Sequence, residues 1–562
     1  MEERRLILAV SLSLLVLVLY RILVPTPHPE VETSPVPSLV ASAPTSVAPA
    51  PAVSSNPSPS PAPVAVAASV SDAKERRVEV HTPTWDLALS NKGARIFSWR
   101  LSGFHDAEGA PFEMVQALPQ GPRPFDLETG DKALDDQLKN ALFTASTEAL
   151  DVPLQGSGTL TFTYSQGDVS VTKSLTVEPG GYMARVRAEL VVSGKPRPVK
   201  VLWGPGVGKP TTAETEVRGY QPPQGVFLAA AGGSVERLTA PKLQTQPRTV
   251  SEVRWAGVES TYFAALFIPV GESGVTELRS TPLPPLEDGK PRVTPEALVT
   301  LTPEAPEAEL FVGPKDYRLL KGLNHELAQV VPVGEWLGPL VVPLMSLLRW
   351  IHLHIGNYGW SIVALTVLIN LAMSPLRHYG FANSQKMAKL APEMKVIQDR
   401  YRGIPALDKR REQMQREIND LYARHGMSMG TQMAVGCLPM LLTLPFLFAI
   451  YRVLQISIEL RGAPFLWIAD LSQKDPLFVT PLIMGASMFL MQRMTPTAMD
   501  PAQQRMMTMM PLILVGTFLW APAGLNLYWL SSNLCSIIQQ GVTQRILKME
   551  ETRPKKKEGR RK

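Results

Sequence analysis

Residues 506–544 read MMTMMPLILVGTFLWAPAGLNLYWLSSNLCSIIQQGVTQ and contain no charged side chain. A helix that crosses a bilayer needs about 20 predominantly apolar residues, so this run is long enough for two crossings. Ala521-Pro522-Ala523-Gly524 interrupts the run near its middle, and Pro and Gly there favour a tight turn. The sequence therefore predicts two membrane helices, at about 506–521 and 525–544, joined as a helical hairpin.

Four more apolar runs are of the kind that crosses a bilayer. They lie at about 6–24, 357–376, 429–452 and 476–492. The first carries only Arg21, near its far end, and the nearest small-x-small cleavage pattern, Ala41-Ser42-Ala43, lies far downstream. We therefore expect an uncleaved anchor over residues 1–24, and the fold class is a membrane α-helical protein with six transmembrane helices.

The charges are divided unevenly along the chain and predict its orientation. Residues 377–430 carry 11 Lys and Arg against 6 Asp and Glu, and residues 545–562 carry 9 against 3. Loops rich in Lys and Arg stay in the cytoplasm, so both segments, including the basic tail 546–562, are expected there. An even number of crossings then places the N-terminus there too. Because the positive charge is confined to two segments, the pI of 9.1 does not indicate a DNA-binding protein.

Between the first two spans lies a long exported region. Residues 25–75 form a linker rich in Pro, Ala and Ser, with 12 prolines between Pro25 and Pro63, and such a stretch is an extended tether. Residues 76–335 show short alternating stretches such as Leu160-Thr161-Phe162-Thr163-Tyr164, which predict an exported β-sandwich. This region contains no hydrolase motif and no metal-ligand pair, so we expect a binding or scaffolding domain and no enzyme.

The two cysteines also give no sign of chemistry. Cys437 and Cys535 both lie inside apolar runs, with no His or second Cys at metal-ligand spacing. His352 and His354 are two residues apart, which does not place them on one face of a helix. No metal site and no disulfide are expected.

Residues 380–427 predict a cytoplasmic helical hairpin. Apolar residues recur every three or four positions on both sides of the break at Gly403-Ile404-Pro405. This seam consists of Met387, Leu390, Met394, Ile397, Tyr401, Met414, Ile418 and Leu421. Two interpretations stay open: a solvated structural hairpin, or a docking site for a ribosome, membrane lipids or a nascent chain. Before the second span, residues 337–354 carry apolar residues on one side and predict an amphipathic helix on the outer leaflet.

Polar residues inside the apolar runs are the candidates for a functional site. They are Thr366, Asn370, Ser374, Arg377, Gln432, Thr443, Asn526, Tyr528 and Ser532. The first three recur every four residues, and Arg377 falls on the same face. Polar side chains in lipid are costly unless they pair or face water, so the stripe predicts either hydrogen bonds between helices or a water-filled groove. The four C-terminal spans contain no Asp or Glu, which argues against an ion-coupled transporter and against an aspartyl intramembrane protease.

Several motifs carry a resemblance to a known family. They are Gly436-Cys437-Leu438-Pro439-Met440-Leu441-Leu442-Thr443-Leu444-Pro445-Phe446, Gly356-Asn357-Tyr358-Gly359, Leu460-Arg461-Gly462-Ala463-Pro464-Phe465, Asp475-Pro476 and Tyr528-Trp529-x-x-Ser532-Asn533. In this order, over about residues 336–545, they resemble the Oxa/Alb/YidC family of membrane protein insertases. Gly313-Pro314-Lys315 and the β-rich region are similar to its Gram-negative form, which has a large periplasmic domain.

The resemblance implies a multi-pass inner-membrane insertase and folding chaperone without a cofactor. Such a protein accepts hydrophobic segments of nascent membrane proteins in a groove and releases them sideways into lipid, alone or with the Sec translocon. The resemblance leaves one alternative, a Sec-dependent folding scaffold. The family carries an arginine in the groove where this chain has Asn370, and we expect Arg377 to supply that charge nearer the cytoplasm.

Overall fold

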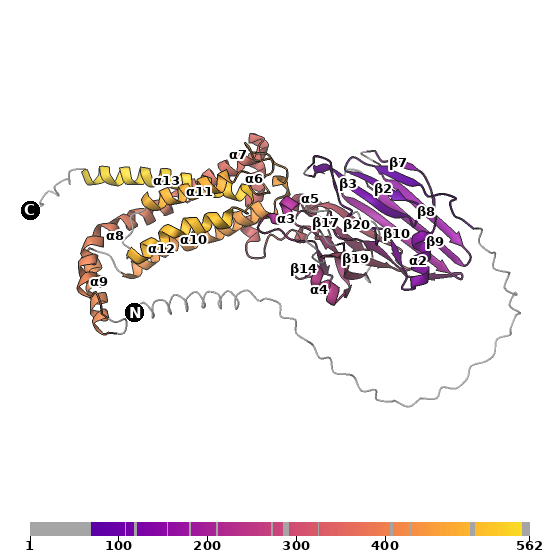
Figure 1. Ribbon diagram of the computed structural model, residues 1–562, viewed down its shortest axis with the longest axis horizontal. Helices are drawn as coiled ribbons and strands as arrows, with labels where there is room; N and C mark the ends of the chain where they lie inside the picture. The colour runs from indigo at the N-terminus through magenta and orange to yellow at the C-terminus, as the bar shows by residue number, and fades with distance from the viewer. Residues whose placement is uncertain are drawn as a thin grey trace, which may run out of the picture. The chain divides into compact units, whose positions relative to one another are not determined.

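The computed structural model describes residues 69–552, except for 107, 117, 119–120, 154–155, 179–180, 209–211, 271–273, 285–291, 324, 405–407, 426–428 and 495–500 (Figure 1). The predicted anchor 1–24, most of the linker 25–75 and the end of the basic tail 546–562 lie outside the described residues. Contacts divide the described chain into two units, residues 389–434 and the remainder, and each unit is described by itself.

The exported region forms three β-sheets, which confirms the expectation of a β-rich domain. A five-stranded sheet has the order β4 (Pro111–Glu113), β3 (Arg95–His105), β2 (Trp85–Ser90), β1 (Arg77–His81), β7 (Ala149–Asp151). A second five-stranded sheet has the order β15 (Arg248–Ser251), β18 (Val275–Leu283), β19 (Arg292–Leu301), β12 (Val199–Trp203), β5 (Leu127–Glu128). The ten-stranded sheet has the order β14 (Glu236–Thr239), β13 (Gln224–Ala229), β16 (Val253–Glu259), β17 (Phe263–Pro269), β20 (Glu307–Pro314), β10 (Met183–Val192), β9 (Val169–Val177), β8 (Gly158–Gln166), β6 (Thr144–Ala145), with β11 (Lys195–Arg197) paired to β10.

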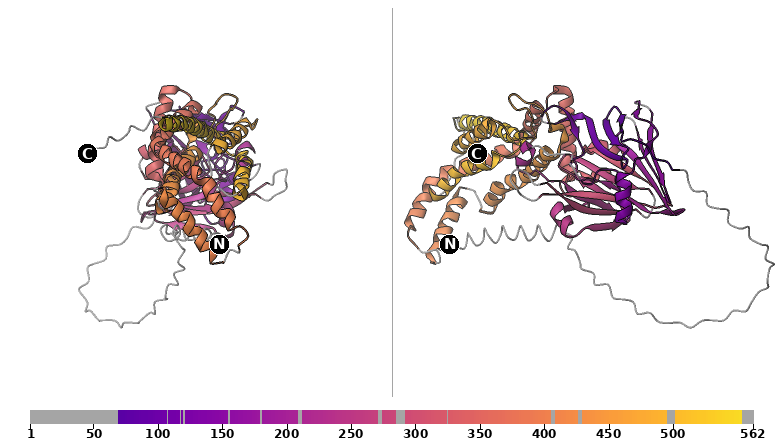
Figure 2. Two further views of the ribbon diagram at one scale, coloured as in Figure 1. Left: turned by 90° about the vertical axis from the view of Figure 1, so that its left-hand side faces the viewer. Right: turned by 45° about the vertical axis from the view of Figure 1, so that its right-hand side comes forward.

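One hydrophobic core joins the three sheets, whose strands lie close together in Figures 1 and 2. It forms because strands such as β9 turn every second residue inward, as the alternating sequence predicts. At its centre the rings of Trp85 and Trp99 lie 4.9 Å apart, and those of Trp99 and Trp203 lie 5.4 Å apart, both in edge-to-face contact. Such pairs stabilise a core beyond the area they bury.

Part of the ten-stranded sheet is covered on its second face as well. All but the last residue of β17 are buried, so this strand reads as a continuous apolar run and does not alternate. The second face of this sheet, with Leu266 on β17 and Trp255 on β16, packs on α5 (Tyr317–Gly322), on the 3₁₀ helix η1 (Leu327–Val330) and on the helix α6 (Gly338–Ile355). Three other short helices, α2 (Lys132–Asn140), α3 (Thr212–Glu216) and α4 (Ala240–Thr245), lie between strands.

Buried charges tie the end of β20 to its neighbours. The Lys315 Nζ lies 2.8 Å from Glu259 Oε2 and donates to the carbonyl of Ser260, and the Nε of Arg237 donates to Glu259 Oε1 at 2.7 Å. Burial acts to raise the pKa of Glu259, but Lys315 and Arg237 outweigh burial and lower it. The Gly313-Pro314-Lys315 segment is therefore fixed where the chain leaves the sheet.

The C-terminal part of the chain is helical. Its helices are α6 (Gly338–Ile355), α7 (Tyr358–Ala372), α8 (Ser374–Arg400), α9 (Arg410–Arg424), α10 (Met429–Ile456), the 3₁₀ helix η2 (Ile458–Leu460), α11 (Val479–Met494), α12 (Pro501–Phe518) and α13 (Ala523–Thr552). Helix α13 packs against both α7 and α11, α6 packs on α7, and α12 packs on α11. The turn predicted between the last two spans is present at 519–522.

Length and hydropathy single out fewer helices than the six predicted spans. Among the described residues, α6 is the one helix that is both long and apolar enough to cross a bilayer by these two criteria. Shorter apolar helical stretches are Tyr358–Ala372, Thr443–Ile456 and Met507–Phe518. Helix α6 buries one stripe, Val341, Leu344, Leu348 and Ile351, and exposes Trp350 and Leu353 on the other side.

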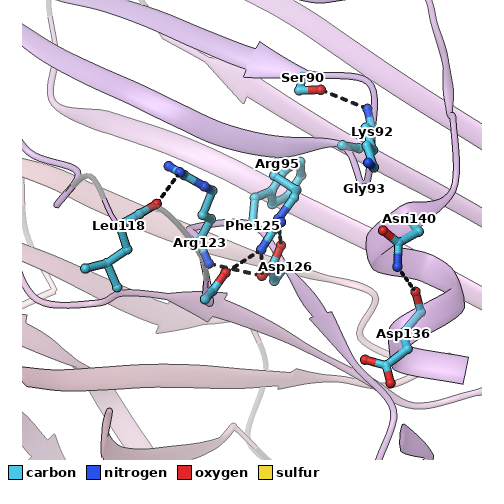
Figure 3. Close-up of polar contacts among 12 residues, drawn as sticks. Ser90, Lys92, Gly93, Arg95, Leu118, Arg123, Phe125, Asp126, Asp136 and Asn140 are labelled. Carbon is cyan, nitrogen blue, oxygen red and sulfur yellow. Dashed lines mark hydrogen bonds and ion pairs between the residues drawn. The ribbon is translucent and has the colours of Figure 1, made fainter. Parts of the chain in front are cut away.

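A buried lysine holds the turn between β2 and β3. Lys173, on β9, is fully buried and donates to the backbone carbonyls of Gly93, Ala94 and Phe125. Close by, Arg95 forms two hydrogen bonds of 2.6 and 2.7 Å with Asp126 (Figure 3). Burial lowers the pKa of Lys173 to about 7, an effect that Asp126 opposes and Arg95 strengthens.

This lysine predicts a pH dependence of stability. Because its folded pKa of about 7 is below its unfolded value, the unfolded chain holds an extra proton between about pH 7 and 10. Stability therefore rises with pH in this window, with a slope of up to about 1.4 kcal/mol per pH unit. Lys173→Met should remove this part of the slope, measured by denaturant unfolding followed by tryptophan fluorescence. Lys200→Met, at a partly exposed position, should keep it; equal slopes for Lys173→Met and wild type would contradict the prediction.

Candidate functional site

The site is built on α7, whose first turn is fixed by its neighbours. Asn357 caps the helix by accepting a hydrogen bond from the Trp360 amide, and its own Nδ2 donates to the carbonyl of Pro464 at 3.0 Å. Gly359 packs so closely on Phe465 that a Cβ there would lie 2.0 Å from its ring. Only glycine fits this contact, so the α7 start and the loop after η2 are held together.

The predicted second span, 357–376, is divided in two. Helix α7 ends at Ala372, and α8 begins at Ser374, directly before Pro375. Proline disfavours helical backbone in the residue that precedes it and removes one backbone donor, which explains a break at this place. The polar stripe predicted from the sequence therefore lies on two helices.

The structure brings several of the predicted polar residues together between α7, α8 and α13. Asn370 is buried, and its side chain lies 3.5 Å from the Ser532 hydroxyl. The Arg377 guanidinium donates to Asn370 Oδ1 and, at 2.9 Å, to the Ser536 hydroxyl. The Gln539 Nε2 donates to the Ser374 carbonyl at 2.8 Å.

We call this set the polar seam; it consists of Thr366, Asn370, Ser374, Arg377 and His378 on one side and Ser532, Ser536, Gln539 and Thr543 on α13. The α13 members are spaced by four, three and four residues, so they share one helix face. His378 meets Thr543 at 3.1 Å, whereas the buried Thr366 donates only to the carbonyl of Ile362 in its own helix. Ser536, like His378, Gln539 and Thr543, was not among the predicted site residues, although it lies one turn after Ser532.

Arg377 carries the charge of the seam. In the part of the chain that the structure describes, no carboxylate forms an ion pair with this guanidinium. Its acceptors are the neutral oxygens of Asn370 and Ser536, one on each side of the helix interface. The side chain therefore places a positive charge beside Asn370, with hydrogen bonds but no neutralising partner.

Other predicted residues lie elsewhere. Asn526 is fully buried at the turn between α12 and α13, where its Nδ2 donates to the Phe518 carbonyl at 3.2 Å. Tyr528 lies one turn before Ser532, near enough to Arg377 to interact with it electrostatically, and is buried in an apolar cluster. Thr443 is half-buried on α10. The side chain of Gln432 lies outside the described residues.

A second polar contact joins α11 to α13 and was not foreseen. The Asn533 Nδ2 donates to the Ser487 hydroxyl at 2.9 Å, and both residues are buried. Asp475 positions the start of α11 by accepting hydrogen bonds from Thr480 and from the Leu477 amide. Burial acts to raise the pKa of Asp475, but these hydrogen bonds outweigh it and hold the pKa below its usual value.

The unit 389–434 contains the two arms of the predicted hairpin. Of the apolar residues predicted to pack inside the hairpin, Leu390, Met394, Ile418 and Leu421 are buried, and Ile397, Tyr401 and Met414 are half-buried. The Tyr422 hydroxyl lies 3.1 Å from the Met394 sulfur, and that of Tyr401 lies 2.8 Å from Glu417. The Met387 side chain lies outside the described residues. Among the described residues, no group of three His, Cys, Asp or Glu could hold a metal ion.

Known proteins resemble this chain along most of its length. The family described as "YidC periplasmic domain" matches residues 77–347, and that described as "60Kd inner membrane protein" matches residues 350–552. Two relatives, from Geobacter sulfurreducens and Syntrophus aciditrophicus, carry the name "Membrane protein insertase YidC". They are 34% and 32% identical to this chain, over 84% and 83% of it and 87% and 84% of their own lengths.

A solved structure is also similar. It is described as an active YidC insertase crystal structure with the first transmembrane domain resolved. The match is 18% identical, covers 85% of this chain and 95% of that one, and has a TM-score of 0.35.

The hydrogen bonds of the polar seam should contribute to the stability of the folded protein. Asn370→Leu should remove the Asn370 acceptor of Arg377 and leave the guanidinium with one hydrogen-bond partner fewer in a buried place. A loss of about 1–3 kcal/mol is expected for an unsatisfied buried group of this kind. Thermal unfolding of the detergent-purified protein measures it. Asn140→Leu, at an exposed position on α2, should change little; equal effects of the two variants would show that the seam contact is not stabilising.

Proposed function

Because the chain belongs to the YidC membrane protein insertase family, we propose that the polar seam is where it receives polar parts of its substrates. The chain is an inner-membrane insertase and does not catalyse a chemical reaction. Its substrates are nascent membrane proteins. The polar segment is received at the interface of α7, α8 and α13, with Arg377 as the charged group.

The single observation that carries the proposal is the Arg377 network. A charge among apolar helices is costly and marks function by default. Here the charge is held by Asn370 and Ser536 and has no carboxylate partner in the described chain. An acidic segment of a substrate would supply the carboxylate partner that Arg377 lacks in the described chain. Asn370 therefore positions the charge that the family carries on the arginine at the corresponding place.

The surroundings of the seam support a lipid environment. Large apolar side chains are exposed on the outward faces of the helices, and a bilayer would cover them. They include Leu371 on α7, Leu482 on α11, Leu512 and Ile513 on α12 and Ile538 on α13. We infer that α7, α10, α11, α12 and α13 cross the membrane, that the segment before Pro25 crosses it as well, and that α6 lies at its outer surface. Both termini are then cytoplasmic.

The polar character of the seam supports the proposed mechanism. A polar tail that meets hydrogen-bonding groups partway through the membrane loses less solvation than one that enters lipid directly. The apolar segment that follows it then partitions sideways into lipid, driven by the apolar area it removes from water. We propose that this happens either alone or beside the Sec translocon. The basic residues of the hairpin, such as Lys395 and Arg416, are exposed and suit contact with a ribosome or with anionic lipid.

The test is insertion by purified protein in liposomes. The substrates are a small single-span protein with an acidic exported tail and the same protein with an uncharged tail. Wild type should insert both. Arg377→Ala should slow the acidic-tailed substrate about tenfold and the neutral one much less, since it removes one attractive charge from a low-dielectric place. Arg377→Lys should keep most of the rate.

Arg424→Ala, at an exposed position at the end of α9, is the matched control and should leave both rates unchanged. Insertion of the acidic tail at the wild-type rate by Arg377→Ala would refute the role of this residue. Insertion of neither substrate by folded wild type would favour the alternative, a scaffold that works only with the Sec translocon.

A further inference from the structure

A short segment of the periplasmic domain contacts four separate places in the helical part of the chain. We call residues 214–220 the clasp segment; it begins in α3 and ends before β13. Its partners are Arg461 and Lys474 in the loop between η2 and α11, Gln455 near the end of α10, and Trp520 in the turn between α12 and α13. The two residues of each contact are 236 to 302 positions apart along the chain, so no local pattern predicts these contacts.

Arg461 makes the strongest of these contacts. Its Nε donates to Glu214 Oε1 at 3.0 Å, and its Nη1 donates to the carbonyl of His105 at 2.7 Å. The guanidinium also lies over the rings of Phe112, at 4.6 Å, and Phe263, at 5.4 Å. The side chains of Arg461 and Glu214 are only 6% and 12% exposed. A pair so well removed from water is much stronger than a surface ion pair and leaves a buried charge if one partner is lost.

Gly219 brings the backbone of the clasp segment against α10. It has a φ of +97°, which side chains rarely adopt, and a Cβ there would lie 2.6 Å from the Gln455 Nε2. The same nitrogen donates to the Gly219 carbonyl at 3.3 Å. The positive φ favours glycine, and a Cβ would also displace the Gln455 amide from its contact with the clasp segment.

The remaining contacts reach the other helices. The Arg218 amide donates to the Trp520 carbonyl at 2.7 Å, which ties the clasp segment to the α12–α13 turn. Lys474 forms an ion pair with Glu216 just before α11. Nearby, the buried Ser472 and Tyr262 of the periplasmic domain line the same pocket.

From these contacts we infer that the clasp segment locks the periplasmic domain onto the helical part and fixes the spacing between the ends of α10, α11 and the α12–α13 turn. The inference goes beyond the proposed function and stands without it, because it concerns the interface between two parts of this chain. The Arg218 amide is its reporter: it is protected from hydrogen exchange only while its bond to Trp520 is closed.

The experiment is hydrogen–deuterium exchange on the full chain in detergent. In wild type, the peptide that contains the Arg218 amide should be protected. Arg461→Gln should speed its exchange at least about tenfold while β9 and β10 keep wild-type protection. Gly219→Ala should do the same by a different route, through strain and contact with Gln455.

Arg187→Gln is the matched control, since its partners Glu189 and Glu307 lie within the periplasmic domain. It should leave the clasp segment protected. Should Arg461→Gln lose the protection of β9 and β10, Gly219→Ala decides the question. A clasp segment that exchanges in wild type as fast as an unstructured peptide, or that keeps its protection in both variants, would overturn the inference.

Discussion

The guanidinium of Arg377 is held between α8 and α13 by oxygen acceptors from both sides. A permanently charged group cannot lie among apolar helices without such acceptors, and it has five donors to satisfy. Asn370 supplies one acceptor from α7, and Ser536 supplies another from α13. The packing of these three helices, the interruption at Pro375 and the row of small polar residues on α13 are all consistent with this one requirement.

Buried charges have a structural role in the periplasmic domain, where each charged side chain has protein partners for its hydrogen-bonding groups. Lys173 is surrounded by three carbonyl oxygens, and Glu259 has both Lys315 and Arg237. These groups fix a turn and a strand end, and nothing is left for a ligand to supply. Arg377 differs because its guanidinium has five donors, and the described chain offers them two acceptors, Asn370 and Ser536. The contrast separates a charge that holds the fold from a charge that is available to a substrate.

The sequence predicts the parts of the structure that depend on local pattern. Alternation identifies strands such as β9, and the three-and-four spacing of Leu390, Met394, Ile418 and Leu421 identifies the residues that are buried in the hairpin. Alternation does not identify strand β17, because both faces of this strand are buried and its sequence is continuously apolar.

The site is predicted less completely, because its contacts join residues far apart in sequence. The polar stripe on the second span was visible, and so was Ser532, but Ser536 and the Asn533–Ser487 bond depend on which face of α13 meets which helix. Pairing of Glu214 with Arg461 follows from the docking of the periplasmic domain on the helical part of the chain. Periodicity within either part contains no information about that docking.

The two ion pairs of the clasp segment should respond differently to ionic strength. Arg461 and Glu214 are largely buried, and the Arg461 guanidinium lies over two aromatic rings, so dissolved salt screens their attraction little. Lys474 and Glu216 are more exposed, and salt weakens such a pair. A rise in external salt would therefore loosen the hold on the segment before α11 first, while the end of α10 stays attached.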